Sequence, residues 1–402
     1  MSATPGMPDP AAVLGDRQNR LRLLLAEATL DAVALVPGPN LIYFSGAAFH
    51  LSERPVLGLF PVRGKPIFLV PVLEAMKVEA LPFPATIFSY DDEVGPAAAC
   101  AQALGELQSR LALARREGVY KPDRAAGTEG DLWLGVEGRR IRYLELERMG
   151  QTPSHPRVFD ADVMFAEQRM RKDDAELAAM RRAVAVAQAA LDATLPMLRA
   201  GVTEKAVAAE LTLQLLRQGS DPNLPFSPIV AAGANGASPH AFPTDKVLAP
   251  GELVIVDWGA CVDGYFSDLT RTFALGGAPL DPRLAEAYRA VRDANAAGRA
   301  AVRPGATGAD VDQAARAVIQ AAGLGERFLH RTGHGLGLEV HEEPDMKAGA
   351  TSPRLAVGMT FTIEPGVYLP GLGGVRIEDD MVVVPGGGES LSDWDRELMV
   401  LD

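Results

Sequence analysis

The stretch VIVDWGACVDGYFSDLTRTF, residues 254–273, decides the fold of the chain around it. Its apolar residues alternate on both sides of Asp263-Gly264, a dipeptide typical of the two-residue turn of a β-hairpin. With that turn, Asp257 faces Thr270, and Asp268 lies two residues away on the same face. The hairpin therefore predicts two aspartates as diagonal neighbours, with Cα atoms about 7–8 Å apart, on an otherwise apolar strand pair.

A second stretch, MTFTIEPGVYLPGLGGVRIEDDMVVV at residues 359–384, repeats this arrangement. Glu364 ends one apolar strand and Glu378 lies in the next. A Gly-x-Thr sequence precedes each hairpin as well. It is Gly201-Val202-Thr203 in the first case and, 104 positions later, Gly305-Ala306-Thr307 in the second. Each Gly-x-Thr sequence lies where one predicted helix ends and the next begins. This repeated order indicates a diverged duplication with a pseudo-twofold axis. The helices are predicted at residues 173–199, 203–216, 284–302 and 310–322.

Such an axis would bring four carboxylates together, and that cluster needs positive charge. At 4 Å and an effective dielectric constant near 20, each pair of like charges costs about 4 kcal/mol. Two divalent cations would balance the four charges. His334, in a Gly-His-Gly sequence whose glycines leave room for close approach, supplies an imidazole. Oxygen-rich donors with one imidazole favour Mn²⁺ or Co²⁺, with Zn²⁺ as an alternative.

Composition limits the class of protein. The chain has 402 residues, 48% of them hydrophobic, and a formal net charge of −13. The acidic balance argues against a nucleic-acid partner, and no apolar run approaches the roughly 18 residues that would span a membrane. The N-terminal MSATPGMPDP does not have the pattern of a signal peptide, and Cys100 and Cys261 are too few for a disulfide framework. We therefore expect a cytoplasmic protein.

The length predicts two domains. Residues 1–163 alternate helix and strand signals, which predicts an α/β domain with a central sheet. Residues 164–402 contain the duplicated helix–helix–hairpin unit. In the first domain we expect helices over residues 16–29 and 96–114 and a run of short strands, DAVALVP, NLIYF, PVLGLFPV and PIFLVPV.

Four stretches carry a family resemblance: VDWGACVDGYFSDLTRTF, HRTGHGLGLEVHEEP, FTIEPGVY and GVRIEDD. They closely resemble the dinuclear metallopeptidases of the pita-bread fold, a group that includes Xaa-Pro dipeptidases (prolidases), aminopeptidase P and methionine aminopeptidase. The N-terminal RLRLLLAEATLDAVALVPGPNLIYFSG resembles the creatinase-like domain of the proline-specific members. The resemblance implies a creatinase-like α/β domain followed by an α+β pita-bread catalytic domain.

The resemblance also implies roles for particular residues. Asp257 would bind one metal ion, His334 and Glu364 the other, and Asp268 and Glu378 would bridge both. The chain has all five ligands, whereas creatinases share the fold but lack this set. The remaining assignments concern catalysis and substrate: His240 and His341 would contact substrate and stabilise the tetrahedral intermediate, Glu364 would also carry a proton, and Arg376 would either bind a substrate carboxylate or hold the metal-binding carboxylates.

The predicted reaction is hydrolysis of the peptide bond before proline by a hydroxide activated between two divalent metal ions. Xaa-Pro dipeptides are the expected substrates. Aminopeptidase P activity on longer Xaa-Pro-Yaa peptides is the alternative, because it would use the same motifs. A more remote alternative is a non-catalytic pita-bread module that binds peptides or proteins. The family resemblance further implies a homodimer.

Overall fold

The computed structural model describes residues 9–124, 130–349 and 353–402. Residues 1–8, part of the stretch examined for a signal peptide, lie outside the described residues. The chain divides into two compact units, one up to Gln168 and the other Arg169–Asp402. The predicted boundary between residues 163 and 164 falls inside helix α6 and stays a prediction. Within the described ranges, no helix combines the length and apolar character needed to cross a membrane.

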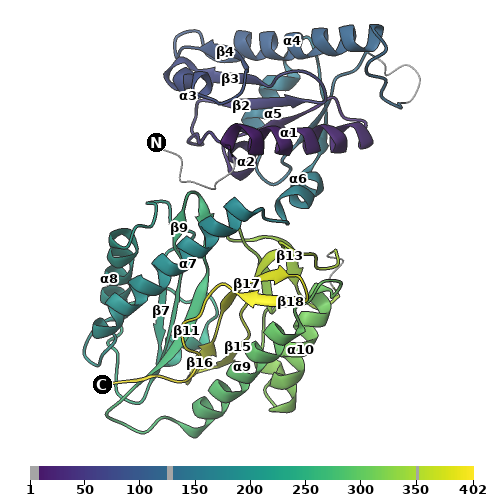
Figure 1. Cartoon of the computed structure of the whole chain (residues 1–402). Coiled ribbons are helices and arrows are strands. Elements are labelled where there is room, and N and C mark those ends of the chain that lie inside the picture. Colours follow the sequence, from purple (N-terminus) through teal and green to yellow (C-terminus); the bar gives the residue numbers. More distant parts are fainter. Residues whose placement is uncertain (1–8, 125–129, 350–352) are drawn as a thin grey trace. The chain divides into compact units, whose positions relative to one another are not determined.

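The first unit is built on a six-stranded sheet in the order β4-β3-β2-β1-β5-β6 (Figure 1). Strands β1, β2 and β3 pair antiparallel, and the outer pairs are parallel. The first three strands are buried along their whole length, as expected for apolar runs in a covered sheet. The predicted α/β domain is therefore confirmed. Its elements are α1 (Pro10–Glu27), β1 (Ala32–Leu35), α2 (Pro39–Ser45), β2 (Leu57–Pro61), β3 (Ile67–Pro71), η1 (Val72–Glu74), α3 (Ala75–Glu79), β4 (Thr86–Tyr90), α4 (Ala97–Arg116), β5 (Trp133–Val136), α5 (Tyr143–Gly150), β6 (Arg157–Asp160) and α6 (Asp162–Arg169).

One predicted strand of this unit is wrong. The stretch NLIYF, residues 40–44, forms helix α2 instead of a strand. Pro39 occupies the first turn, where its fixed φ favours a helix, and Gly46 ends the helix in the left-handed conformation, with φ 75°. A short buried apolar run has no periodicity that separates helix from strand, so these two flanking residues were the better signal.

The second unit contains two helix pairs and the two hairpins. Its elements are α7 (Asp174–Thr194), η2 (Leu195–Met197), α8 (Glu204–Arg217), β7 (Ile229–Ala232), η3 (Gly233–Ala237), β8 (Leu253–Trp258), β9 (Cys261–Val262), β10 (Tyr265–Phe266), β11 (Leu269–Leu275), α9 (Pro282–Ala301), α10 (Gly308–Ala321), η4 (Gly325–Arg327), β12 (Gly333–Gly335), β13 (Glu342–Met346), β14 (Thr360–Ile363), β15 (Gly366–Leu369), β16 (Gly373–Arg376), β17 (Asp379–Val384), β18 (Gly387–Ser390) and β19 (Val400–Leu401).

The first hairpin has the register that the sequence predicts. Strands β8 and β11 pair with Asp257 opposite Thr270, and β9 and β10 continue the same register to the turn. Asp263 and Gly264 have φ angles of 53° and 80°, which is the left-handed geometry of a two-residue hairpin turn. The turn residues therefore fix the face on which Asp257 lies.

The second hairpin follows the same plan. Strands β14 and β17 form its outer ladder, β15 and β16 its inner ladder, and one register continues through both. At the break between the ladders this register places Glu364 opposite Glu378. The helix signals match as well, because Thr203 and Thr307 both cap a helix with their side-chain oxygens. The predicted internal duplication is thus confirmed at the level of individual residues.

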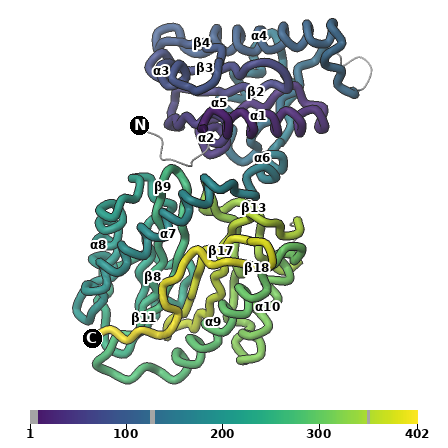
Figure 2. Tube along the Cα trace, in the orientation of Figure 1, coloured from purple at the N-terminus to yellow at the C-terminus, as the bar shows by residue number. Residues whose placement is uncertain are grey.

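The two halves meet where the hairpins touch. The Glu378 N–H donates to the Thr270 carbonyl at 3.0 Å, and the Thr270 hydroxyl donates to Glu378 Oε2 at 2.7 Å. Each helix pair packs against its own strands: α7 and α8 cover β7, β8 and β11, while α9 and α10 cover β15 and β16 (Figure 1). The C-terminal segment runs back along the unit, and β19 pairs in parallel with β11 (Figure 2).

Candidate active site

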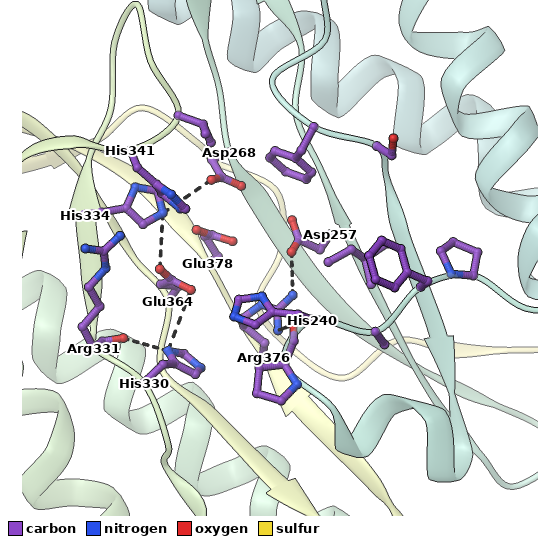
Figure 3. Close-up of a pocket in the computed structure, with 18 residues that line it drawn as sticks. His240, Asp257, Asp268, His330, Arg331, His334, His341, Glu364, Arg376 and Glu378 are labelled. Carbon is purple, nitrogen blue, oxygen red and sulfur yellow. Dashed lines mark hydrogen bonds and ion pairs between the residues drawn. The ribbon is translucent and has the colours of Figure 1, made fainter. Parts of the chain in front are cut away.

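The convergence of the hairpins forms the floor of a pocket of about 540 Å³ in the second unit (Figure 3). All eight residues that the sequence assigns to metal binding, catalysis or substrate binding line this pocket. The other side chains that line it are largely apolar or aromatic. The predicted residues are His240, Asp257, Asp268, His334, His341, Glu364, Arg376 and Glu378, and the remaining lining residues are Phe226, Ser227, Ile229, Pro239, Ala241, Phe242, Pro243, His330, Arg331 and Val340.

Three of the five predicted metal ligands form a compact cluster. One potential ligand atom from each of Asp268, His334 and Glu378 lies within 4.8 Å of the other two. Glu364 joins this cluster, because its Oε1 lies 3.4 Å from His334 Nε2, which is itself 3.6 Å from Asp268 Oδ2. In Figure 3 these four side chains point toward one another.

Burial and mutual repulsion raise the pKa values of these carboxyl groups. Asp268 and Glu378 are almost fully buried, and their pKa values lie well above the ordinary range. Burial is the main cause, and the neighbouring carboxylates add to it. Burial also raises the pKa of Glu364, to about 7. Without added positive charge, these carboxyl groups could not all be ionised at neutral pH.

Asp257 is held from one side by Arg376. Arg376 Nη2 donates to Asp257 Oδ2 at 2.5 Å, and the same guanidinium donates to the Tyr368 hydroxyl at 2.8 Å and to Thr270 Oγ1 at 3.2 Å. The other oxygen, Asp257 Oδ1, is buried and has no hydrogen-bond partner among the described residues. Because a buried carboxylate oxygen is rarely left without a partner, this atom is available to a cation.

Burial favours the neutral form of two histidines of the site, which is the form that can bind a metal ion. Burial, the largest cause, lowers the pKa of His334 well below its usual range, and burial also lowers that of His341. The two imidazole rings are in edge-to-face contact, with centroids 4.2 Å apart. A Cβ on Gly333 would lie 1.9 Å from the Thr362 carbonyl oxygen, so only glycine allows the strands to approach this closely beside His334.

These observations fit a divalent metal centre. The donor set combines four acidic side chains with one imidazole, and one of its buried oxygens has no hydrogen-bond partner among the residues that the structure describes. The carboxyl groups carry raised pKa values that bound cations would lower. The residues present therefore match the chemistry of hard or borderline divalent ions.

The sequence reasoning missed several residues of the site. Tyr368 accepts a hydrogen bond from Arg376 and lies 3.0 Å from His330 Nε2 through its hydroxyl oxygen. Arg331 lines the pocket beside the Gly-His-Gly strand. Its proximity to His334 in sequence was a signal, but a single arginine next to a motif does not reveal where its side chain points.

Comparison with known proteins identifies the class to which this site belongs. The metallopeptidase family M24 matches residues 178–385, and the creatinase/prolidase N-terminal domain family matches residues 17–171. The first match covers the duplicated unit and its pocket. The chain belongs to metallopeptidase family M24, with a creatinase-type N-terminal domain and a pita-bread catalytic domain.

Solved structures agree with this assignment. A dipeptidase from Pyrococcus horikoshii is 38% identical with a TM-score of 0.84, over 96% of this chain and 100% of its own. A prolidase from Thermococcus sibiricus is 29% identical with a TM-score of 0.85, over 98% and 100%. An X-Pro aminopeptidase from Thermotoga maritima is 26% identical with a TM-score of 0.75, over 95% and 99%. The likeness thus extends across both domains.

Proposed function

We propose that this enzyme hydrolyses the peptide bond preceding proline, with Xaa-Pro dipeptides as its main substrates. The observation that carries the proposal is the convergence of all eight predicted residues on one pocket. The likeness to the Thermococcus prolidase and the Pyrococcus dipeptidase supports the same substrate class.

The five acidic and imidazole side chains would hold two divalent metal ions. In the proposed arrangement Asp257 would hold one ion, His334 and Glu364 would hold the other, and Asp268 and Glu378 would be shared by the two. When bound, such ions supply a nucleophilic water at neutral pH and stabilise negative charge on the substrate carbonyl oxygen. Mn²⁺ is the proposed metal, because the donors are mostly oxygen, and Co²⁺ or Zn²⁺ would be alternatives.

The surrounding residues would handle the protons. The bond before proline is a tertiary amide, so its nitrogen leaves readily only when it has been protonated. Glu364, whose pKa burial raises to about 7, would take a proton from water and pass it to that nitrogen. Burial lowers the pKa of His341, and its imidazole N–H would donate a hydrogen bond to the substrate. His240 lines the same pocket and would stabilise the tetrahedral intermediate.

The pocket wall suits a proline side chain. Phe226, Ile229, Phe242 and Val340 present apolar surface to the same cavity that contains the carboxylates. A pyrrolidine ring has no N–H to satisfy within a peptide and gains by burying its methylene groups. The wall would therefore accept the ring while the polar floor holds the scissile bond.

Aminopeptidase P activity is the second candidate, and the likeness to the Thermotoga X-Pro aminopeptidase favours it. The two activities differ in whether peptide continues beyond the proline. The deciding assay compares hydrolysis of Ala-Pro, Ala-Pro-Ala and Ala-Ala after metal removal and addition of Mn²⁺, Co²⁺ or Zn²⁺. We expect Ala-Pro to be cleaved fastest. Faster cleavage of Ala-Pro-Ala would favour the aminopeptidase, and equal cleavage of Ala-Ala would contradict specificity for proline.

A pair of variants in one hairpin tests the metal assignment. Asp268→Asn removes a proposed bridging ligand, whereas Asp263→Asn changes an exposed residue in the turn, where asparagine tolerates the left-handed backbone. We expect Asp268→Asn to lose nearly all activity and to bind fewer metal ions per chain by elemental analysis. Asp263→Asn should retain both. Full metal content in Asp268→Asn would contradict the bridging role.

The proposal also includes a cytoplasmic location and a homodimer. Cys100 and Cys261 are both free and buried, in keeping with a reducing compartment. The dimer follows from the family resemblance, and sedimentation analysis of the purified chain would test it.

A further inference from the structure

His240 lies at the exposed apex of a loop, and both arms of this loop are fixed to the rest of the unit. The outgoing arm leaves β7 through η3 and packs directly on β16. A Cβ on Gly374 would lie 2.1 Å from the Gly236 carbonyl oxygen. The returning arm is bonded to the start of α8, because the Lys205 N–H donates to the Thr244 carbonyl at 3.1 Å. The apex is therefore carried on two anchored arms.

Glu204, the first residue of α8, joins the two arms at the neck of the loop. Its side chain is fully buried. From the outgoing arm, the Ala232 N–H donates to Oε1 at 2.7 Å and the Asn235 side-chain amide donates to Oε2 at 2.8 Å. From the returning arm, the Thr244 N–H and hydroxyl donate to Oε2 at 2.9 and 2.7 Å. One carboxylate thus holds both arms.

This neck has one favoured geometry. Among the described residues, the groups that donate to Glu204 are two backbone amides, a side-chain amide and a hydroxyl. A carboxylate buried among neutral groups is tolerated only while hydrogen bonds satisfy its oxygens. Moving either arm would break one or more of these bonds and leave a buried carboxylate oxygen short of donors. The neck therefore resists displacement of one arm relative to the other.

The apex is tied to the same network through its main chain. The Asn235 amide that donates to the neck carboxylate also donates to the Phe242 carbonyl at 3.2 Å. On the other side of His240, Arg376 Nη1 donates to the Pro239 carbonyl at 3.3 Å (Figure 3). The Phe242 side chain is 80% exposed, so its packing contributes little to holding the apex. The position of His240 therefore depends on bonds that lead back to the neck.

We propose that Glu204 is a positioning residue for His240 and acts through the loop of residues 232–244. The inference rests on the proposed function, in which His240 stabilises the tetrahedral intermediate. Glu204 is not among the described residues that line the pocket, so its effect on the reaction passes through the loop. A displacement of about 1 Å of a group at a reacting centre can lower the rate by about 100-fold, so a stiff neck matters to catalysis.

The first test measures the loop without any substrate. In Glu204→Gln one carboxylate oxygen becomes an amide NH2, which cannot accept a hydrogen bond from the loop. We expect amide hydrogen exchange, followed by mass spectrometry, to become about 10-fold faster over residues 232–244 but not in β8. Glu210→Gln is the matched control, because Glu210 lies on the same helix but pairs with Arg217. It should exchange like the wild type. Unchanged exchange of the loop in Glu204→Gln would overturn the proposal.

The second test asks whether the loop acts through His240. We expect Glu204→Gln to lower kcat/KM for Ala-Pro by about 10- to 100-fold at unchanged metal content. In a His240→Ala background the same change should lower kcat/KM by less than about 2-fold, because the group that it positions is already absent. Equal losses in the two backgrounds would show damage that does not pass through His240 and would overturn the proposal.

A milder variant keeps the test decisive if Glu204→Gln does not fold. Thr244→Val removes only the hydroxyl that donates to Glu204, on an exposed residue, and should lower kcat/KM by about 2- to 10-fold. A loss of the same size without His240 would contradict the proposal. Failure of the wild type to cleave Ala-Pro would overturn the proposed function instead, and hydrogen exchange would still decide whether Glu204 holds the loop.

Discussion

Replacing Arg376 by methionine would separate the two roles predicted for this arginine. Methionine keeps much of the side-chain volume but removes every hydrogen bond. Asp257 Oδ2, the Tyr368 hydroxyl and Thr270 Oγ1 would each lose a donor in a buried site. If Arg376 holds the metal-binding carboxylates, its loss damages folding and metal binding together.

The structure sets the size of the effect. Removing one partner of a buried charge pair costs about 3–5 kcal/mol, because the remaining charge is left without compensation. For a unit of this size, 1 kcal/mol lowers Tm by about 2–4 °C, so we expect Arg376→Met to lower the Tm of the catalytic domain by about 6–20 °C. Bound metal should reduce the loss, because a cation on Asp257 replaces part of the missing charge.

Differential scanning calorimetry in excess chelator and in excess Mn²⁺ would measure this loss. Arg181→Met is the control, since Arg181 forms an exposed pair with Glu389 and should contribute under about 1 kcal/mol. The reasoning would be refuted if Arg376→Met melted like the control and only raised KM for Ala-Pro over Ala-Pro-amide. That outcome would assign Arg376 to substrate binding.

Two further predictions concern stability. Glu364, Asp268 and Glu378 have raised pKa values, so the metal-free protein holds extra protons when folded and loses stability as pH rises from about 4.5 to about 7 and above. Chelation should therefore lower Tm more near pH 8 than near pH 5, and equal losses would contradict this. Gly333→Ala places a methyl group against the Thr362 carbonyl and should cost about 1–3 kcal/mol by urea unfolding, with lower metal affinity. Gly105→Ala, in open space within a helix, should be neutral or stabilising; similar effects of the two variants would contradict the packing argument.

Much of the catalytic domain could be predicted from local sequence rules. Asp263-Gly264 has one favoured turn geometry, which sets the register and hence the faces of Asp257 and Thr270. The two Gly-x-Thr sequences predict two helix starts, and both threonines cap a helix in the structure. These features depend on a few neighbouring residues, so their physical cause is contained in the sequence itself. The repulsion expected among four converging carboxylates connected these features to metal chemistry, and the family resemblance then assigned roles to individual residues.

The local rules failed where two conformations fit the same pattern. The buried run at residues 40–44 satisfies a helix and a strand equally well by hydrophobicity. Pro39 and Gly46, which flank this run, favour the helix. The strand was nevertheless predicted, because the run is short and almost entirely apolar. Burial on every side removes the alternation that would have separated the two structures.

The sequence by itself determined the hairpins, the duplication and the residue types of the site. Only the tertiary structure decided which acidic side chain each of the two arginines in the pocket contacts. Arg376 meets Asp257 across 119 residues of chain, and Arg331 meets Asp345 on a neighbouring strand. A long cationic side chain can reach many partners, and the packing of distant elements selects among them. The carboxylate that each arginine contacts is therefore a property of the fold.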